Sequence, residues 1–201
     1  MTVARDRSAG PEAKPLRLFV AVDVPEHVKD NLRSATARFR DRIPGARWTN
    51  PDAWHVTVKF LGTTWPRVVE DVRATVEAAA ADEEPFETAL TELGAFPRPT
   101  MARVLWAGLA DSDGRFATLA ASLDRALEEH FDPGGRAFTP HLTLARLAPP
   151  RNLREFVPDL VGTNVASEKF VASALVLYRS HLSPAGARYE PLLVAPFGRD
   201  A

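Results

Sequence analysis

The sequence predicts a mixed α+β protein in which two similar lobes face each other, and three observations support this prediction. The chain has 201 residues, which is enough for one large domain or two small lobes that share a core. Segments with strand patterns alternate with segments with helical patterns. The order strand, helix, strand, helix, strand repeats when the chain is shifted by 86 residues.

Alternation and helical spacing define the elements of the first half. Val56, Val58 and Phe60 alternate with polar residues, which is the pattern of a half-buried strand. Apolar residues between Val68 and Val76 recur on one face at helical spacing. We expect strands at 16–22, 54–61 and 86–93, and helices at 66–81 and from Pro25 to the stop at Pro44-Gly45.

The second half shows a similar succession. Phe116, Leu119 and Leu123 form the clearest apolar stripe, which ends before the turn sequence Asp132-Pro133-Gly134-Gly135. We expect Pro149-Pro150 to prevent the strand at 138–144 from continuing, because proline donates no ladder hydrogen bond. Strands are expected at 103–108, 138–144, 170–178 and 189–194, helices at 114–130 and near 153–157, and a turn at Ser183-Pro184-Ala185-Gly186.

We assign residues 1–15 to a flexible N-terminal tail and residues 16–197 to a single bilobal domain. The tail lacks the apolar stretch of a signal peptide. Ala21 precedes His55 by 34 residues, and Ala107 precedes His141 by the same 34. The matched spacing suggests an internal duplication with an offset of 86 residues.

Composition and charge exclude several functions. The chain has 25 Lys and Arg against 26 Asp and Glu, so any nucleic-acid site has to be local. It has no Cys, which excludes disulfide scaffolds, thiolate catalysis and Cys-based metal sites. No segment approaches the roughly 18 apolar residues typical of a membrane span. We expect a cytoplasmic monomer that does not bind membranes.

Two of the five histidines occupy the same four-residue motif, His-x-Thr-x with aliphatic x. The motifs are His55-Val56-Thr57-Val58 and His141-Leu142-Thr143-Leu144. On a strand, His and Thr project from one face about 6.8 Å apart, while the aliphatic pair enters the core. Two such strands that face each other would present two imidazoles and two hydroxyls to one cleft.

This set of groups suits phosphodiester hydrolysis without a metal. One neutral imidazole can take a proton from water, and a second, protonated imidazole can give one to the leaving oxygen. Threonine hydroxyls can donate hydrogen bonds to the nonbridging phosphoryl oxygens, where charge builds in the transition state. We predict no metal and no cofactor.

Less specific interpretations of the motif stay open. A single His-x-Thr can be a half-buried strand histidine that is hydrogen-bonded to its neighbour. Histidine is also a common zinc ligand, although no third ligand is evident in the sequence. We assign no catalytic role to the other histidines, His27, His130 and His181.

The segments around both motifs resemble the 2H phosphoesterases. Within them, they are similar to the bacterial and archaeal RNA 2′,3′-cyclic phosphodiesterases, historically called 2′-5′ RNA ligases. The resemblance extends from about residue 17 to residue 193. It rests on Arg17–Val22, Trp54–Gly62, Arg103–Gly108 and Phe138–Arg146, with a weaker match at Leu177–Leu182.

The resemblance implies a bilobal α+β fold with two antiparallel sheets related by a pseudo-twofold axis, helices outside and a central cleft. It implies hydrolysis of an RNA-terminal or nucleoside 2′,3′-cyclic phosphate to a 2′-phosphate. By the same resemblance, His55 donates a proton to the leaving 3′ oxygen and His141 is the base that activates water. Thr57 and Thr143 then hold the phosphate.

Four further residues are weaker candidates for substrate binding. Arg146 lies five places after the second His, where the family commonly has a basic residue that contacts phosphate or RNA. Phe19 and Phe138 suit the core, but either could present a ring to a base. Lys59 is included with the expectation that it lies on the strand face opposite His55 unless the strand bulges.

Other functions remain as alternatives. Two belong to the same superfamily: 2′-5′ RNA joining and hydrolysis of ADP-ribose 1″,2″-cyclic phosphate. A third is a non-catalytic RNA-end-binding module, and a metal-dependent phosphatase is a fourth, which predicts sensitivity to EDTA. The expected partners are RNA 3′ ends with a 2′,3′-cyclic phosphate or small cyclic nucleotides.

Overall fold

A computed structural model of the chain describes residues 14–135, 137–183 and 186–198. Residues 1–13 of the predicted tail lie outside the described residues. Pro184 and Ala185 of the predicted turn also lie outside them.

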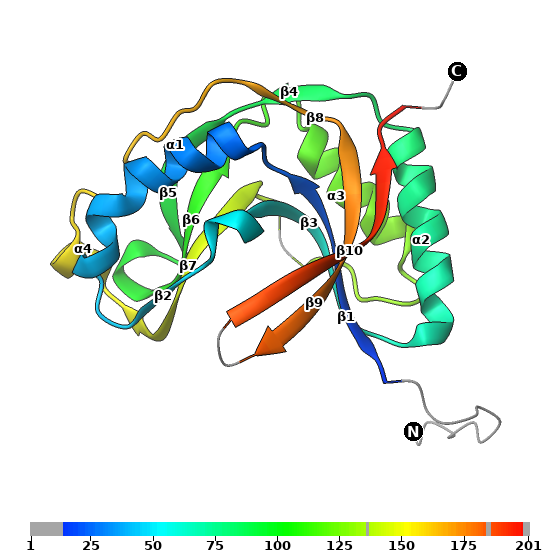
Figure 1. Ribbon diagram of the computed structural model, residues 1–201, viewed down its shortest axis with the longest axis horizontal. Helices are drawn as coiled ribbons and strands as arrows, with labels where there is room; N and C mark the ends of the chain where they lie inside the picture. Colours follow the sequence, from blue (N-terminus) through cyan, green and yellow to red (C-terminus); the bar gives the residue numbers. More distant parts are fainter. Residues whose placement is uncertain (1–13, 136, 184–185, 199–201) are drawn as a thin grey trace.

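Antiparallel strands form the centre of the molecule (Figure 1). One group has the order β10-β9-β1-β3 and the other the order β7-β6-β5, and they meet where Val56 of β3 pairs with Leu142 of β7. The predicted α+β class with two antiparallel sheets is therefore confirmed. The strands are β1 (Leu16–Asp23), β2 (Ala46–Trp48), which pairs with β7, β3 (His55–Thr64), β5 (Leu90–Phe96), β6 (Ala102–Leu109), β7 (His141–Arg151), β9 (Ala174–Ser183) and β10 (Gly186–Pro196); a small separate sheet pairs β4 (Phe86–Thr88) with β8 (Phe170–Ala172).

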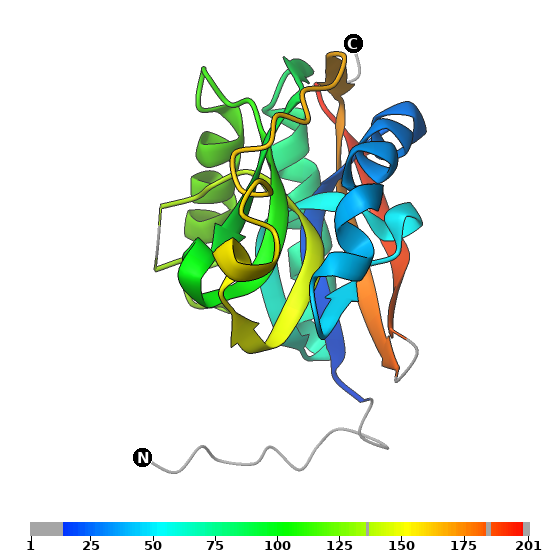
Figure 2. The same ribbon diagram turned by 90° about the vertical axis from the view of Figure 1, so that its left-hand side faces the viewer.

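Helices cover the outside of the two strand groups (Figures 1 and 2). Pro66 begins α2 at a position where the missing N–H of proline costs no hydrogen bond. The buried face of α3 includes Phe116, Leu119 and Leu123, as the sequence stripe predicted. The helices are α1 (Glu26–Thr36), continued by the 3₁₀ turn Ala37–Arg42, then α2 (Pro66–Ala81), α3 (Arg115–Ala126) and α4 (Leu153–Phe156), with further 3₁₀ turns at Pro51–Ala53 and Pro99–Met101. Within the described residues no helix is long and apolar enough to cross a bilayer.

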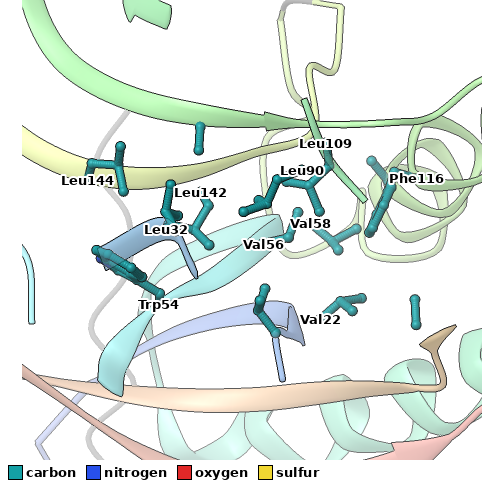
Figure 3. Packing of buried hydrophobic residues seen from close by; sticks show 14 of the residues in the cluster. Val22, Leu32, Trp54, Val56, Val58, Leu90, Leu109, Phe116, Leu142 and Leu144 are labelled. Carbon is teal, nitrogen blue, oxygen red and sulfur yellow. The ribbon is translucent and has the colours of Figure 1, made fainter. Parts of the chain in front are cut away.

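The aliphatic residues of both motifs are part of the main core (Figure 3). Val56, Leu142 and Leu144 are completely buried, and Val58 is 5% exposed. Burying a side chain of this size stabilises the fold by about 1.5–3 kcal/mol. This burial fixes which face of each strand points inward. We call the opposite face of β3 and β7, which carries the His and Thr of both motifs, the motif face.

Each motif strand contains a bulge directly after its threonine. On β3, Thr57 pairs with Ala21 but Lys59 pairs with Val20, so β3 has one extra residue at this step. An extra residue reverses the alternation of the side chains that follow. As a result Lys59 turns to the buried side of the sheet, although a regular strand would leave it on the motif face.

The bulge of β7 is at the corresponding position. Thr143 pairs with Trp106, whereas Ala145 pairs with Leu105. Leu144 and Ala145 are therefore both buried, and the next residue, Arg146, is exposed on the motif face.

Some expected boundaries were wrong. The expected strand 86–93 is divided between β4 and β5, and the expected strand 170–178 is divided between β8 and β9. The strand that Pro149-Pro150 were expected to end continues to Arg151. Its pairing with β6 jumps from Arg146 to Arg151 at a register shift, so the two prolines fall where no ladder hydrogen bond is required of them.

Candidate active site

The backbone orients both motif histidines in the same way. The Nδ1 atom of His55 lies 2.8 Å from the carbonyl oxygen of Ala53, and Nδ1 of His141 lies 2.7 Å from that of Thr139. A carbonyl can only accept a hydrogen bond, so Nδ1 carries the proton in both rings. The Nε2 atom is thus the nitrogen available for proton transfer, and it is a base when the ring is neutral.

The two motifs lie on either side of one strand contact. Val56 and Leu142 are register partners at the junction of the two strand groups, and their side chains point into the core. The residues on each side of this pair, which are the histidines and threonines, are half-buried on the motif face. The antiparallel direction brings His55 toward Thr143 and Thr57 toward His141. The structure thus brings the four predicted residues together.

Hydroxyl contacts help to set the geometry of the threonines. The Oγ1 atom of Thr57 lies 3.1 Å from Nε2 of His55. The hydroxyl of Thr49 donates to the carbonyl oxygen of Thr143 over 2.9 Å, and accepts from the indole Nε1 of Trp54 over 2.7 Å. Thr49 therefore connects the second motif to the turn that precedes the first.

Aromatic rings enclose both imidazoles. Phe19 stacks on His55 with ring centroids 4.7 Å apart, and Tyr189 meets the same ring edge-on at 5.1 Å. Phe96 meets His141 edge-on at 5.0 Å. Burial disfavours the charged imidazolium. It lowers the pKa of His55 from 6.5 to about 4, and it also lowers the pKa of His141.

The fixed charges near the two histidines differ. Asp23 is the register partner of His55 and opposes the fall of its pKa, whereas Gly108 is the partner of His141. The hydroxyl of Tyr178 donates to Asp23, at 2.8 Å from Oδ1 and 3.0 Å from Oδ2. The guanidinium of Arg146 instead adds to the fall of the His141 pKa. The two halves are thus alike in backbone and unlike in charge.

The same register also corrects the proposed alignment of the halves. Asp23 and Gly108, the partners of the two histidines, are 85 residues apart, whereas His55 and His141 are 86 apart. At the motifs, Ala21 therefore corresponds to Trp106 and not to Ala107.

A pocket of about 410 Å³ adjoins the first histidine. It lies between the turn before β3 and the paired strands β9 and β10, and it takes in Asp23 and Tyr178. Its lining residues are Asp23, Lys29, Asn50, Asp52, Ala53, Trp54, His55, Tyr178, Ala187, Arg188, Tyr189 and Pro191. Within the part of the chain that the structure describes, no group of three or more His, Asp or Glu side chains could hold a metal ion.

Two of the weaker substrate-binding candidates lie at positions compatible with that role. Arg146 is exposed on the motif face, close enough to His141 to lower its pKa. Phe138 is half-buried in the segment before β7, where it packs against the core.

Direct substrate binding by Lys59 is contradicted. Its ammonium is buried beneath α3, where it pairs with the Asp124 carboxylate and donates to the carbonyl oxygen of Asp132 over 3.1 Å. We expected Lys59 on the face opposite His55 in a regular strand. Lys59 does lie on the face opposite His55, but the reason given for it was wrong. In a regular strand, residues four apart lie on the same face, and it is the bulge that moves Lys59 to the face opposite His55.

Direct stacking of a base on Phe19 is also contradicted, because Phe19 is only 1% exposed. The rings of His55, Phe60, Tyr178 and Tyr189 surround it. Phe60 was not predicted as a site residue, but it is 52% exposed on the motif face with the guanidinium of Arg17 at 5.5 Å from its ring centroid. The bulge that exposes Phe60 has no evident sequence signal.

Asp23 is a further site residue that the sequence did not predict. Its sequence signal was its place at the end of the first strand, but the pairing with His55 depends on the register. Tyr178 was noted only as part of a weak match, and its bond to Asp23 joins residues 155 positions apart.

Solved structures share this fold. The crystal structure of TT0787 from Thermus thermophilus has a TM-score of 0.76 and 29% sequence identity, covering 92% of this chain and all of that one. The apo structure of E. coli LigT has a TM-score of 0.71 at 23% identity, with 93% of this chain covered. The fold and the paired His-x-Thr strands are those of a 2H phosphoesterase.

The family follows from the sequence. A family model described as the 2′-5′ RNA ligase superfamily matches residues 24–184. The RNA 2′,3′-cyclic phosphodiesterase of Methanothermobacter thermautotrophicus is 30% identical over 181 residues, covering 89% of this chain and 97% of the relative. The protein of the same name from Aeropyrum pernix is 32% identical and covers 78% and 91%. This chain belongs to the 2′-5′ RNA ligase superfamily.

Proposed function

We propose that this protein hydrolyses RNA-terminal or nucleoside 2′,3′-cyclic phosphates to 2′-phosphates by metal-independent acid–base catalysis. The observation that carries the proposal is the pair of imidazoles, each with Nδ1 bonded to a backbone carbonyl two residues before it, so that Nε2, which in His55 lies 3.1 Å from the Thr57 hydroxyl, is the nitrogen on the motif face. The relatives named RNA 2′,3′-cyclic phosphodiesterase support the same substrate class.

In the proposed reaction, Nε2 of neutral His141 takes a proton from water as the water oxygen attacks phosphorus. The bond between phosphorus and the 3′ oxygen breaks, and protonated His55 gives its Nε2 proton to that oxygen. The hydroxyls of Thr57 and Thr143 donate to the nonbridging oxygens, which carry the developing charge. The product is a 2′-phosphate with a free 3′ hydroxyl, and proton exchange with solvent then returns His55 to its protonated form and His141 to its neutral form.

The charges near the site support this division of roles. A carboxylate opposite His55 favours the imidazolium that a proton donor needs, and a guanidinium near His141 favours the neutral base. Burial lowers the pKa of both rings and thus disfavours the protonated His55 that the reaction needs. The negative charges of Asp23 and of the substrate's phosphoryl group counteract this effect and favour protonation of His55.

Arg146 and Phe138 complete the proposed site, the first as a phosphate ligand and the second beside the entering nucleotide. We also propose that the protein acts as a monomer in the cytoplasm. A single domain over residues 16–197 that arose by duplication completes this proposal.

The test is hydrolysis of a 2′,3′-cyclic nucleotide in excess EDTA, with the product isomer identified by chromatography. Wild type should form the 2′-phosphate, while His55→Ala and His141→Ala should each lose about 10²–10⁴-fold in rate. His27→Ala, at an exposed position on α1, is the matched control and should keep full activity. Full activity in both site variants would exclude the assignment.

The same assay separates the alternatives. Loss of activity in EDTA that zinc or magnesium restores would indicate a metal-dependent phosphatase. Joining of a cyclic-phosphate end to a 5′-hydroxyl RNA would indicate the ligase reaction. Binding without turnover of any cyclic ester would indicate an RNA-end-binding module.

A further inference from the structure

A pair of arginines lies on the motif face beyond the second histidine. Arg47 of β2 is the register partner of Arg146 of β7, and both are exposed. The ladder positions on either side face inward, since Trp48 pairs with buried Ala145 and Ala46 pairs with buried Leu147. Directly opposite residues of an antiparallel ladder project on the same side, so both guanidiniums leave the sheet on the motif face.

This pair carries two positive charges without a protein counter-charge. Within the described ranges, neither guanidinium forms an ion pair with a carboxylate. Like charges directly opposite each other destabilise a sheet. The guanidinium fork matches the oxygens of a phosphate, so an anionic phosphate would relieve the repulsion and bind both side chains.

The position of the pair relates it to the reaction centre. Arg146 is near enough to His141 to lower its pKa, and Arg47 lies on β2, which pairs with β7 on the same edge as β3 but further along the strand. The arginine pair therefore extends from the site of the terminal phosphate along β7. An RNA strand that places its end between the histidines carries its next negative charge one nucleotide away.

We propose that Arg47, with Arg146, binds the internucleotide phosphate that precedes the cyclic end, so that the enzyme favours RNA ends over cyclic mononucleotides. The proposal rests on the proposed function, because it needs the terminal phosphate to occupy the site of the two histidines. A cyclic mononucleotide has no internucleotide phosphate and cannot make the contact. The overall charge of −1 is consistent with such a local site.

The test compares kcat/KM for a 2′,3′-cyclic mononucleotide and for a dinucleotide that ends in a 2′,3′-cyclic phosphate. Arg47→Gln should lower the value for the dinucleotide about tenfold and leave the mononucleotide within about twofold. The dependence of log kcat/KM on log salt should become shallower by about 0.7 for the dinucleotide alone. Arg47→Lys keeps the charge and should keep the wild-type salt dependence.

Arg67→Gln is the matched control, because Arg67 is an exposed arginine on α2, outside the motif face. It should change neither substrate. An equal loss on both substrates in Arg47→Gln, or no loss on either, would overturn the proposal. Dissociation constants for a 2′-phosphorylated dinucleotide and mononucleotide give a second readout without turnover. If no cyclic ester is hydrolysed but Arg47→Gln still weakens binding of the dinucleotide alone, the proposed function fails and the phosphate site stands. If wild type binds the dinucleotide and the mononucleotide equally well, the phosphate site is overturned.

Discussion

Each motif histidine takes its orientation from the carbonyl group two residues before it. The bonds from Nδ1 to Ala53 and to Thr139 are within 0.1 Å of each other in length. Such a bond selects the tautomer of the ring without a buried acid. The difference between the two histidines must then come from the charges around them, which makes the acid–base assignment testable by changing one charge.

Asp23→Asn should shift the pH profile in one direction. Asp23 favours protonated His55, so its removal should lower the pKa of His55 and reduce kcat/KM at neutral and alkaline pH, while kcat/KM in more acidic solution, where His55 is protonated in both proteins, should stay unchanged. Asp23→Glu should restore most of the wild-type profile. The charged or titratable groups that face His55 are Asp23 from β1, Lys29 from α1, His141 from β7, Tyr178 from β9 and Tyr189 from β10.

Asp52→Asn is the control for this shift, because it removes an exposed carboxylate from the same pocket without touching the partner of His55. Its profile should match wild type. If both variants shift alike, the pocket acts through its total charge and Asp23 has no special role.

Burial of His55 also makes stability depend on pH. The folded pKa of about 4 is below the ordinary 6.5, so the unfolded chain binds more protons between these values. The stabilisation is complete above pH 6.5 and is lost as pH falls through 4, by up to about 3 kcal/mol. Urea unfolding at about pH 7.5 and 4.5 should show a smaller loss in His55→Gln than in wild type; equal losses would contradict the prediction.

At the scale of the element, the bulges of β3 and β7 decide which residues reach the substrate side. Strict alternation would place Lys59 on the motif face and Phe60 in the core. The bulge exchanges them, and the equivalent bulge of β7 exposes Arg146. The strand positions and the four motif residues could be predicted because apolar alternation is a property of neighbouring residues in the sequence. The bulges could not, because they arise from pairing with β1 and β6.

Lys59→Met should lower stability and spare catalysis. It would leave Asp124 without its buried cation, which costs about 3 kcal/mol when one partner of such a pair is removed. Asp124 would still accept a bond from the backbone N–H of Gly134 over 3.0 Å. Urea unfolding measures the loss, and kcat/KM should stay within about twofold of wild type. Reduced activity with unchanged stability would contradict this prediction and indicate that Lys59 contributes to substrate binding.

At the scale of the whole molecule, two strand groups share one core and meet at one residue pair. Leu142 is completely buried there, between His141 and Thr143, and its partner is Val56. The distance between the two imidazoles therefore depends on core packing at this junction. A cavity here should affect both stability and catalysis, unlike a cavity elsewhere in the core.

Leu142→Ala should lower the free energy of unfolding by about 2–5 kcal/mol and reduce kcat/KM at a temperature where the variant is folded. Leu123→Ala is the matched control, because Leu123 is equally buried but lies on α3. It should cost similar stability and leave kcat/KM unchanged. Equal activity in the two variants would show that the junction does not set the imidazole spacing.

The sequence by itself determined the α+β class, most of the strands and helices, and the four motif residues, because periodicity and short motifs are local properties. It also identified the family through the segments around both motifs. Only the tertiary structure decided that Asp23 faces His55, that Arg47 faces Arg146 and that Lys59 is buried. These pairs join residues far apart in the chain, and a one-residue change in strand register would replace every one of them.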